Sequence, residues 1–143
     1  MSIARIIEQR DITVVTCRCD DTVAAAVALL TEKRIGAMPV VDADGAVLGI
    51  FSERDVIRCL NKHGAEALSA KVEEAMTAPA ITVEPDTSEN QALALMTRRR
   101  FRHLPVVANG RMIDFVSIGD LVKLRIDQIE SEATAMRDYL RNA

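Results

Sequence analysis

The sequence predicts an α+β fold, built from two tandem copies of a β-α-β-β-α unit and followed by a long C-terminal helix. Three observations predict it: an internal repeat, the same alternation of strand-like and helix-like segments in both halves, and a heptad-spaced apolar pattern near the C-terminus. Each half of a 143-residue chain would be marginally stable alone, so we expect the two copies to share one core.

The internal repeat emerges when residues 14–41 are aligned with residues 80–107. Unrelated segments of this length would share roughly two residues by composition alone. The shared positions here are Thr16/Thr82, Asp20/Asp86, Ala26/Ala92, Ala28/Ala94, Leu29/Leu95, Thr31/Thr97, Arg34/Arg100, Pro39/Pro105, Val40/Val106 and Val41/Val107. With one residue deleted in the second copy, the match resumes at Gly45/Gly110, Ser52/Ser117 and Asp55/Asp120. The two halves are therefore copies of one unit.

Each copy opens on a short β-branched run, residues 12–16 and 80–83, which is typical of a strand. An Asp then precedes a segment rich in Ala and Leu. In the second copy Ala92, Leu95 and Met96 recur there at helical spacing. We therefore expect a strand followed by a helix in both copies.

A hairpin is expected after each helix. Residues 38–41 and 104–107 form an apolar strand with a Pro near its start, where the missing N–H is tolerable. A turn carrying Asp44-Gly45 or Asn109-Gly110 leads into a third strand. That strand, at residues 47–51 or 112–116, ends at a Ser-x-x-Asp sequence that opens a second helix. This order predicts three-stranded sheets covered by helices on one face.

The remaining segments are a connection and a C-terminal helix. Residues 61–77 join the copies and are expected to be partly helical around residues 65–76. Apolar residues then recur at alternating spacings of four and three, which matches the a/d seam of a coiled coil. They are Val122, Ile126, Ile129, Ala133, Met136 and Leu140. Such a helix requires a partner, which could be a second chain or the helix's own module.

Composition and charge exclude several classes of protein. The chain is 49% hydrophobic and 27% charged, which indicates a globular protein. A net charge of −3 and a pI near 5.4 argue against a nucleic-acid-binding protein, although Arg98–His103 form a local basic cluster. The sequence shows neither a secretory signal nor a long apolar segment, so we expect no membrane span and a cytoplasmic location. The three cysteines are expected to be reduced thiols.

Catalytic and metal-binding motifs are absent from the sequence. It contains no Gly-x-Ser-x-Gly, no phosphate-binding Gly-x-x-x-x-Gly-Lys-Ser/Thr loop and no His-Glu-x-x-His. Cys17-x-Cys19 lacks a second ligand pair, and His63 and His103 lie far from it in sequence. We therefore expect neither an enzyme nor a metal protein.

These features together resemble the cystathionine-β-synthase (CBS) domain family, whose members occur as tandem pairs and commonly bind adenosine-containing ligands. The resemblance rests on the apolar-x-Pro-Val-Val strand of both copies and on two runs, Gly49–Asp55 and Phe115–Asp120. It implies a first repeat at residues 8–62, a connection at 63–78, a second repeat at 79–125 and a helical extension at 126–143. The second copy departs from the family pattern, because Asp114 stands where the first copy has Gly49.

The resemblance also implies where a ligand binds. In the family fold the two copies pack about a pseudo-twofold axis and form two clefts, each taking its ribose-binding Asp from one copy and its first-strand Thr from the other. The first cleft would combine Asp120, Ser117, Ile118, Arg102 and His103 with Thr16, Ala37 and Met38. The second would combine Asp55, Ser52, Arg54, Arg34, Ile35 and Gly36 with Thr82 and Pro85, and with His103 and Leu104 at the shared rim.

The chemistry of these residue types fits a nucleotide, with a structural alternative for each. A carboxylate such as Asp55 or Asp120 can accept hydrogen bonds from both ribose hydroxyls. Alternatively, Ser-x-x-Asp is a capping box at a helix N-terminus, and the two roles are compatible. Arg102 and His103 can bind phosphate. The strand threonines could orient a base, or simply fill a β-strand.

The sequence therefore predicts a non-catalytic sensor of AMP, ADP, ATP or NAD. We expect a homodimer that acts on an unidentified regulated protein, with neither a membrane nor a nucleic acid as a partner. The alternative is a ligand-independent dimerisation or scaffold domain, in which the repeat only provides surface.

Overall fold

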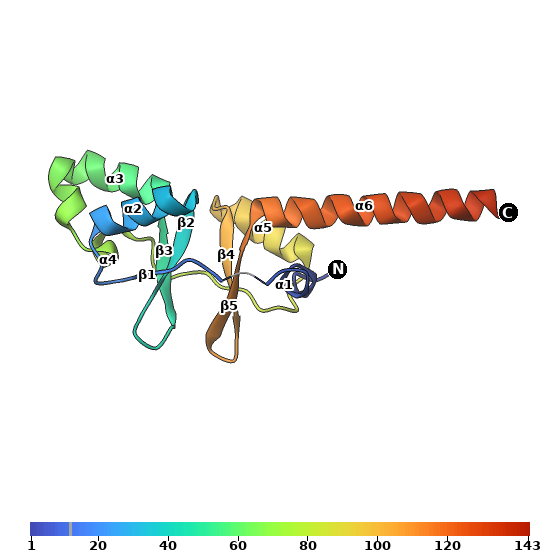
Figure 1. Ribbon diagram of the computed structural model, residues 1–143, viewed down its shortest axis with the longest axis horizontal. Coiled ribbons are helices and arrows are strands. Elements are labelled where there is room, and N and C mark those ends of the chain that lie inside the picture. Colours follow the sequence, from blue (N-terminus) through green and yellow to red (C-terminus); the bar gives the residue numbers. More distant parts are fainter. Residues whose placement is uncertain (12) are drawn as a thin grey trace. The chain divides into compact units, whose positions relative to one another are not determined.

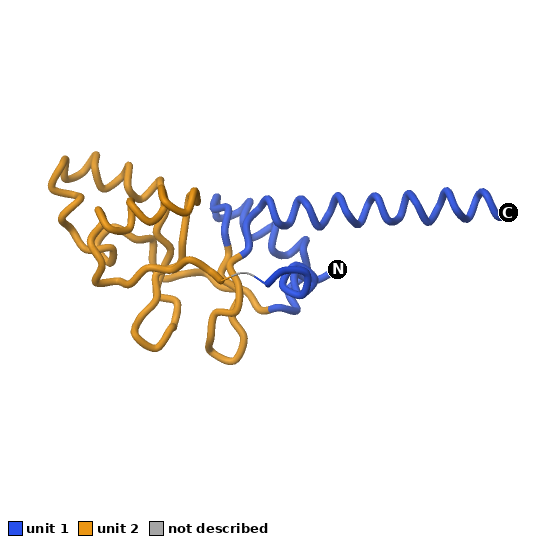
Figure 2. The backbone as a smooth tube through the Cα atoms, viewed as in Figure 1, with its two compact units in different colours: residues 1–11, 85–103, 116–143 blue, residues 12–84, 104–115 orange. Residues whose placement is uncertain are grey.

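The computed structural model describes residues 1–11 and 13–143 and divides the chain into two compact units (Figures 1 and 2). Unit 1 consists of residues 1–11, 85–103 and 116–143, and unit 2 of residues 12–84 and 104–115. Helices and strands alternate as the repeat predicts, and the long C-terminal helix is present. The α+β class is thus confirmed.

Unit 2 contains a three-stranded sheet in the order β1-β2-β3, with β1 at Cys17–Arg18, β2 at Ala37–Val41 and β3 at Val47–Ser52. Strand β1 is parallel to β2, and β3 is antiparallel to it. Helix α2 (Val23–Lys33) packs its buried side chains against Met38, Val40 and Phe51 of this sheet. The sheet face that carries these residues and α2 therefore form the core of unit 2.

The helices after the first strands begin and end in the same way in both copies. Thr22 caps α2 by accepting from Ala25 N, and Ser88 caps α5 (Glu89–Arg99) by accepting from Gln91 N. Both helices end at an Arg in the left-handed conformation, with φ of 55° at Arg34 and 58° at Arg100. The Arg34/Arg100 identity thus marks a common helix C-terminus, at which the chain turns toward the next strand.

The connection between the copies follows α3 (Glu53–His63), whose last three residues belong to the segment 61–77 expected to be the connection. It contains a 3₁₀ helix, η1 (Gly64–Ser69), and a short helix, α4 (Val72–Ala75). Thr77 then pairs with Ile50 through two backbone hydrogen bonds of 2.9 Å. The connection therefore extends the edge of β3.

Gly49 is the residue that allows this pairing. A Cβ added at Gly49 would lie 2.6 Å from the backbone oxygen of Thr77 and 3.0 Å from the sulfur of Met76. A close approach of the connecting segment thus explains why this position holds a Gly.

We expect Gly49→Ala to lower the free energy of unfolding by about 1–3 kcal/mol, because the backbone of Thr77 must move away from β3. Gly36→Ala is the matched control, since the atoms nearest to its added Cβ would be those of the Glu53 carboxyl group, at 3.6 Å or more. Denaturant unfolding of both variants measures the difference. Equal stability of the two variants would show that the approach at Gly49 is unimportant.

Unit 1 contains α1 (Ala4–Glu8), α5 and α6 (Ile118–Arg141). Its buried residues come from all three helices and include Ile6, Met96 and Leu121. Helix α1 was not expected from the sequence. Helix α6 runs without a break through residue 126, where the sequence analysis places the start of a separate extension.

Strands β4 (His103–Ala108) and β5 (Arg111–Ser117) form the second hairpin. Asn109 and Gly110 have positive φ angles of 54° and 77°, as the Asn-Gly turn predicts. Val83 forms a single parallel bridge with Val106. The second copy therefore has two full strands and one bridge where three strands were expected.

The expected first strands are wrong in position. Residues 13–16 of the first copy are not in a strand, which begins at Cys17, and Ile12 lies outside the described residues. In the second copy only Val83 of residues 80–83 pairs. β-Branched residues favour extended backbone, but pairing depends on where the chain meets its neighbour.

No helix within residues 1–11 and 13–143 is long and apolar enough to cross a membrane.

Candidate functional site

The same junction of hairpin and helix is built once in each unit. In unit 2 the backbone N–H of Glu53 donates to the Gly36 carbonyl at 3.0 Å, and in unit 1 Ile118 N–H donates to the Arg102 carbonyl at 2.8 Å. At both junctions Ser-x-x-Asp forms a capping box. The capping box, which the sequence offered as a structural role for Ser-x-x-Asp besides ribose binding, is thus present in both copies. The two junctions differ in what surrounds the Asp.

The unit 1 junction leaves part of its carboxylate open. Asp120 Oδ2 accepts from the Ser117 backbone N–H at 2.8 Å and lies 3.0 Å from Arg10 Nη1. Asp120 Oδ1 has no hydrogen bond within the described part of the chain, and the side chain is 28% exposed. A carboxylate oxygen can accept two hydrogen bonds, so Oδ1 is available to a ligand with hydroxyl groups.

Several basic residues belong to the Asp120 junction. Arg10, at the C-terminal side of α1, contacts Asp120 directly, and its side chain is 20% exposed. His103 begins β4, and Arg102 precedes it. The N-terminus of α6 adds the positive end of a helix dipole. This junction therefore combines an acceptor for hydroxyl groups with groups that favour an anion.

Burial lowers the pKa of His103 below its usual 6.5, the Asp120 charge opposes this shift, and the Arg102 charge adds to it. Between the folded-state pKa and about 6.5, the unfolded chain binds more protons at this position than the folded chain. The free energy of unfolding contributed by His103 therefore rises with pH in this window and falls as the pH drops through it.

We expect His103→Gln to lose less stability than the parent chain when the pH is lowered from 7.5 to 5.5, because the variant has no imidazole to protonate. Denaturant unfolding at both pH values provides the measurement, with His63→Gln at an exposed position as the control. If His103→Gln and the parent lose the same stability, burial of the imidazole does not affect the pH dependence.

The unit 2 junction is closed around its carboxylate. Asp55 is 2% exposed, and both of its oxygens accept hydrogen bonds. Oδ2 accepts from the Ser52 backbone N–H at 2.9 Å and from the Ser52 hydroxyl at 3.0 Å. Oδ1 accepts from the Thr77 hydroxyl at 2.8 Å and from Arg58 Nη1 at 3.2 Å. In this arrangement Asp55 holds the connection onto α3 and presents no oxygen to a ligand.

A surface pocket of about 490 Å³ lies beside this junction, between α2 and α3. Arg34, Ile35 and Gly36 line it, as does Glu53, whereas Ser52, Arg54 and Asp55 do not. The rest of its lining is mainly apolar: Val27, Leu30, Val56 and Ile57, with the Thr31 side chain. The structure thus separates the Arg34–Gly36 group of predicted site residues from the Asp55 group.

The other predicted site residues differ in exposure. Ala37 and Met38 are buried in β2, and β1 is paired only with Val40 and Val41 farther along that strand. Thr16 is half-buried just before β1. These three residues belong to unit 2, so their assembly with Asp120 into the first cleft stays a prediction.

Three further predicted residues lie around β4. Leu104 is fully buried in this strand, Thr82 is exposed just before the Val83 bridge, and Pro85 is half-buried where the chain enters unit 1. Pro85 supplies a carbonyl that accepts from Ala4 N at 2.9 Å, so its backbone helps to hold α1. The second cleft as a whole also stays a prediction.

Sequence reasoning missed the partners of the two Asp residues. Thr77 and Arg10 lie in the segments that lead into the second and the first copy, and both were outside the aligned repeat. The repeat itself gives no signal for them, because Arg10 aligns with Met76 and Thr77 aligns with Asp11 at the offset of the two copies. Asp114, which stands where the first copy has Gly49, is accommodated locally. Its side chain is buried, and its Oδ1 accepts a hydrogen bond from Phe115 N at 2.7 Å.

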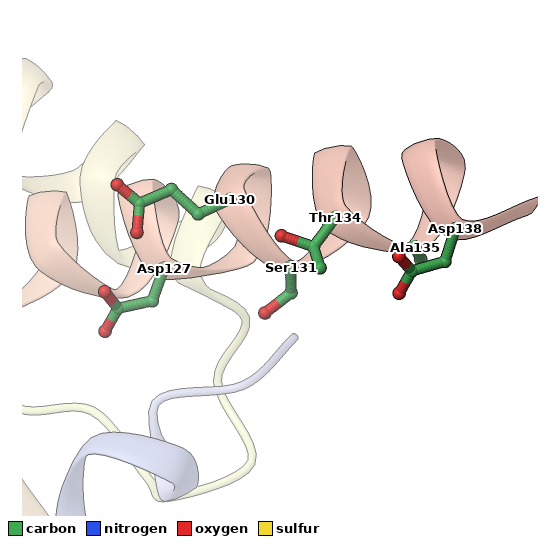
Figure 3. Close-up of a pocket in the computed structure, with 6 residues that line it drawn as sticks. All are labelled: Asp127, Glu130, Ser131, Thr134, Ala135 and Asp138. Carbon is green, nitrogen blue, oxygen red and sulfur yellow. The ribbon is translucent and has the colours of Figure 1, made fainter. Parts of the chain in front are cut away.

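Two other features carry no ligand site. The six residues drawn in Figure 3 line a depression, but all of them lie on α6, so no second element encloses it. Burial raises the pKa of Cys17 to about 12, with the charges of Asp21 and Cys19 adding to the shift. This thiol is therefore protonated at neutral pH and a poor nucleophile.

Comparison with protein families identifies the CBS domain twice, at residues 9–62 and 72–127. The mitochondrial CBS domain-containing protein CBSX3 of Arabidopsis thaliana is 38% identical over 129 residues, covering 87% of this chain and 63% of that protein. Inosine-5'-monophosphate dehydrogenase of Mycobacterium bovis is 40% identical over 111 residues, covering 76% of this chain and 20% of the enzyme. The chain therefore spans less than two thirds of either relative.

Solved structures show the same fold. A CBS-domain containing protein from Agrobacterium tumefaciens superposes with a TM-score of 0.82 at 39% identity, covering 87% of this chain and 92% of that chain. CBSX2 in complex with AMP superposes with a TM-score of 0.75 at 26% identity, covering 90% and 98%.

Proposed function

The chain belongs to the CBS domain family, and from that premise we propose that it is a non-catalytic regulatory module that binds an adenine nucleotide: AMP, ADP, ATP or NAD. The observation that carries the proposal is the open junction at Asp120 in unit 1. Its carboxylate has one oxygen held by the capping box and Arg10, and a second without a partner among the described residues.

The proposed contacts follow from this geometry. The ribose hydroxyls donate to Asp120 Oδ1, which the capping box leaves available. The α6 N-terminus and the guanidinium groups of Arg10 and Arg102 favour the negative phosphates. Ser117 holds Asp120 in place through its backbone N–H and also accepts from Asp120 N at 3.1 Å.

Two relatives support the class of ligand and the regulatory role. CBSX2 has been solved with AMP, which makes AMP the first ligand to test. Inosine-5'-monophosphate dehydrogenase matches this chain over only a fifth of its length, which is consistent with a module that accompanies a separate catalytic part. A regulatory output requires that the nucleotide bind two states of the protein unequally.

Thermal melting of the full chain against AMP, ADP, ATP and NAD tests the proposal. A ligand at 100 times its dissociation constant stabilises a protein by about 2.7 kcal/mol, which is a readily measured shift of the melting temperature. GMP is the matched control, since it offers the same ribose and phosphate with a different base. No shift with any adenine nucleotide would exclude the sensor function.

A ligand-independent dimerisation domain is the second candidate function, and the row of exposed apolar residues on α6 favours it. The homodimer and the cytoplasmic location are part of either proposal. The melting experiment separates the two candidates, because a scaffold would melt at the same temperature with and without nucleotide.

A further inference from the structure

We propose that α6 pairs with the α6 helix of a second copy of this chain as a parallel, in-register, two-stranded coiled coil over residues 122–140. This inference concerns assembly and does not depend on nucleotide binding. It also selects one of the two partners that the sequence left open for the C-terminal seam.

Helix α6 has two apolar faces, and its own unit covers only one of them. Leu121 and Leu124 are buried at 0% and 5% exposure. The opposite face carries the a/d seam, whose large residues Val122, Ile126, Ile129, Met136 and Leu140 are 48–66% exposed. Figure 2 shows that the C-terminal part of α6 extends past every other element of unit 1. Nothing in unit 1 therefore covers the seam.

The seam has the narrow shape of a two-stranded coiled coil. Spacing alternates strictly between four and three, which places Ile126, Ala133 and Leu140 at a positions and Ile129 and Met136 at d positions. From residue 127 onward the positions farther around the helix are mostly polar, as Figure 3 shows for Asp127, Ser131, Thr134 and Asp138, with the small Ala135 among them. The apolar stripe is thus limited to the width that one partner helix covers.

The charges that flank the seam specify its direction. In a parallel pair, each g residue meets the e residue five positions later on the partner helix. Glu132 then meets Arg137 of the second copy, and Arg125 meets Glu130. Both pairs are of opposite charge and occur twice in a symmetric dimer.

Arg125 also lies 2.7 Å from the buried Glu89 of its own unit, but its side chain remains 49% exposed, so a second Nη can reach a partner carboxylate. Among the residues that the structure describes, Glu132 accepts only a 3.4 Å hydrogen bond from Gln128 on its own helix. Neither residue is prevented from pairing across a dimer.

An antiparallel pair of the same helices brings like charges together. With the seams fully overlapped, e faces e and g faces g, so Glu130 meets Glu130, Glu132 meets Glu132, and Lys123 meets Arg137. All three contacts are repulsive. The charges at the e and g positions therefore favour the parallel arrangement and disfavour the antiparallel one.

The first experiment is sedimentation equilibrium of the full-length chain and its Ile129→Lys variant. We expect the parent to be a dimer of the 15.7 kDa chain and the variant to dimerise at least about a hundredfold more weakly, because a lysine would enter the apolar seam. Ser131→Lys, on the opposite face, should stay dimeric. Since Ile129 is 54% exposed in the monomer, the variant should keep the parent's circular dichroism. A monomeric parent, or a dimeric Ile129→Lys variant, would overturn the proposal.

The direction is tested by reversing charges at low salt. In the parallel pair, Arg137→Glu turns two attractive contacts with Glu132 into repulsive ones and should weaken the dimer about tenfold. The double variant Glu132→Arg/Arg137→Glu should restore it. In an antiparallel pair, Arg137→Glu would instead relieve the repulsion from Lys123 and strengthen the dimer, which would contradict the proposal.

A disulfide gives an independent reading of the direction. Leu140 is the last residue of the seam and lies within α6, so Leu140→Cys should cross-link two parallel chains under mild oxidation. In an antiparallel pair the two Leu140 positions would lie roughly 27 Å apart, at 1.5 Å per residue. Ser131→Cys is the matched control, and the parent chain gives the background from Cys17, Cys19 and Cys59. Cross-linking of Leu140→Cys at no more than the control rate would overturn the parallel arrangement.

Discussion

Asp55→Ala is expected to lower the free energy of unfolding by about 3 kcal/mol, within a range of 2–4 kcal/mol. The substitution removes four hydrogen bonds from a carboxylate that is 2% exposed, and it leaves the Ser52 backbone N–H and the Thr77 hydroxyl without their acceptor. A lost helix cap alone costs about 0.5–2 kcal/mol, and hydrogen bonds to a charged group contribute about 1.5–3 kcal/mol. Thr77 adds to the effect, since Asp55 ties the connection to α3.

Chemical denaturation of Asp55→Ala and the parent chain measures this loss. Asp20→Ala is the matched control, because Asp20 is an exposed carboxylate in the same unit, and it should change stability by less than about 0.5 kcal/mol. A loss at Asp55 no larger than at Asp20 would mean that the closed hydrogen-bond arrangement is not what stabilises this junction.

Asp120→Asn is expected to weaken adenine-nucleotide binding by about 10- to 100-fold while changing the stability of the unliganded chain little. The amide replaces one carboxylate oxygen by a donor, so at least one charge-assisted hydrogen bond to a ribose hydroxyl is lost. The capping box keeps an acceptor for the Ser117 N–H in the variant. The nucleotide concentration that raises the melting temperature by half its maximum should therefore increase by the same factor.

The control for Asp120→Asn is Asp55→Asn, which changes the corresponding residue of the other copy. Asp55 has no open oxygen, so its amide variant should melt at a lower temperature and still bind nucleotide as the parent does. If the two variants lost affinity equally, the ribose would be bound at both junctions and the distinction between an open and a closed carboxylate would be wrong.

Much of the fold could be predicted because the repeat provides a sequence signal for each element in both copies. The Asn109-Gly110 turn, the helices after each first strand and the Ser-x-x-Asp caps all follow from local chemistry. The first strands could not be located correctly, because residues 13–16 have the right propensity and yet the pairing begins at Cys17. Helix α1 was missed because it is held by tertiary contacts, with Ile3 and Ile6 buried within unit 1.

The candidate site was predicted in its residue types more than in its arrangement. In the sequence, the run that ends at Asp55 matches the family pattern more closely, because it contains Gly49. The run that ends at Asp120 follows Asp114, which stands in the place of that Gly. The structure explains the Gly by the passage of Thr77 beside β3, and this same passage closes Asp55 off. A long-range contact of this kind depends on where the connecting segment runs, which no local pattern encodes.

A titration of the ¹⁵N-labelled full chain with AMP, followed by amide chemical shifts, tests most directly whether the Asp120 junction binds the nucleotide. We expect saturable shifts that include the amides of His103, Ile118 and Asp120, at the junction with the open carboxylate. Absence of any saturable shift, or shifts confined to the Ser52–Asp55 junction, would contradict this expectation.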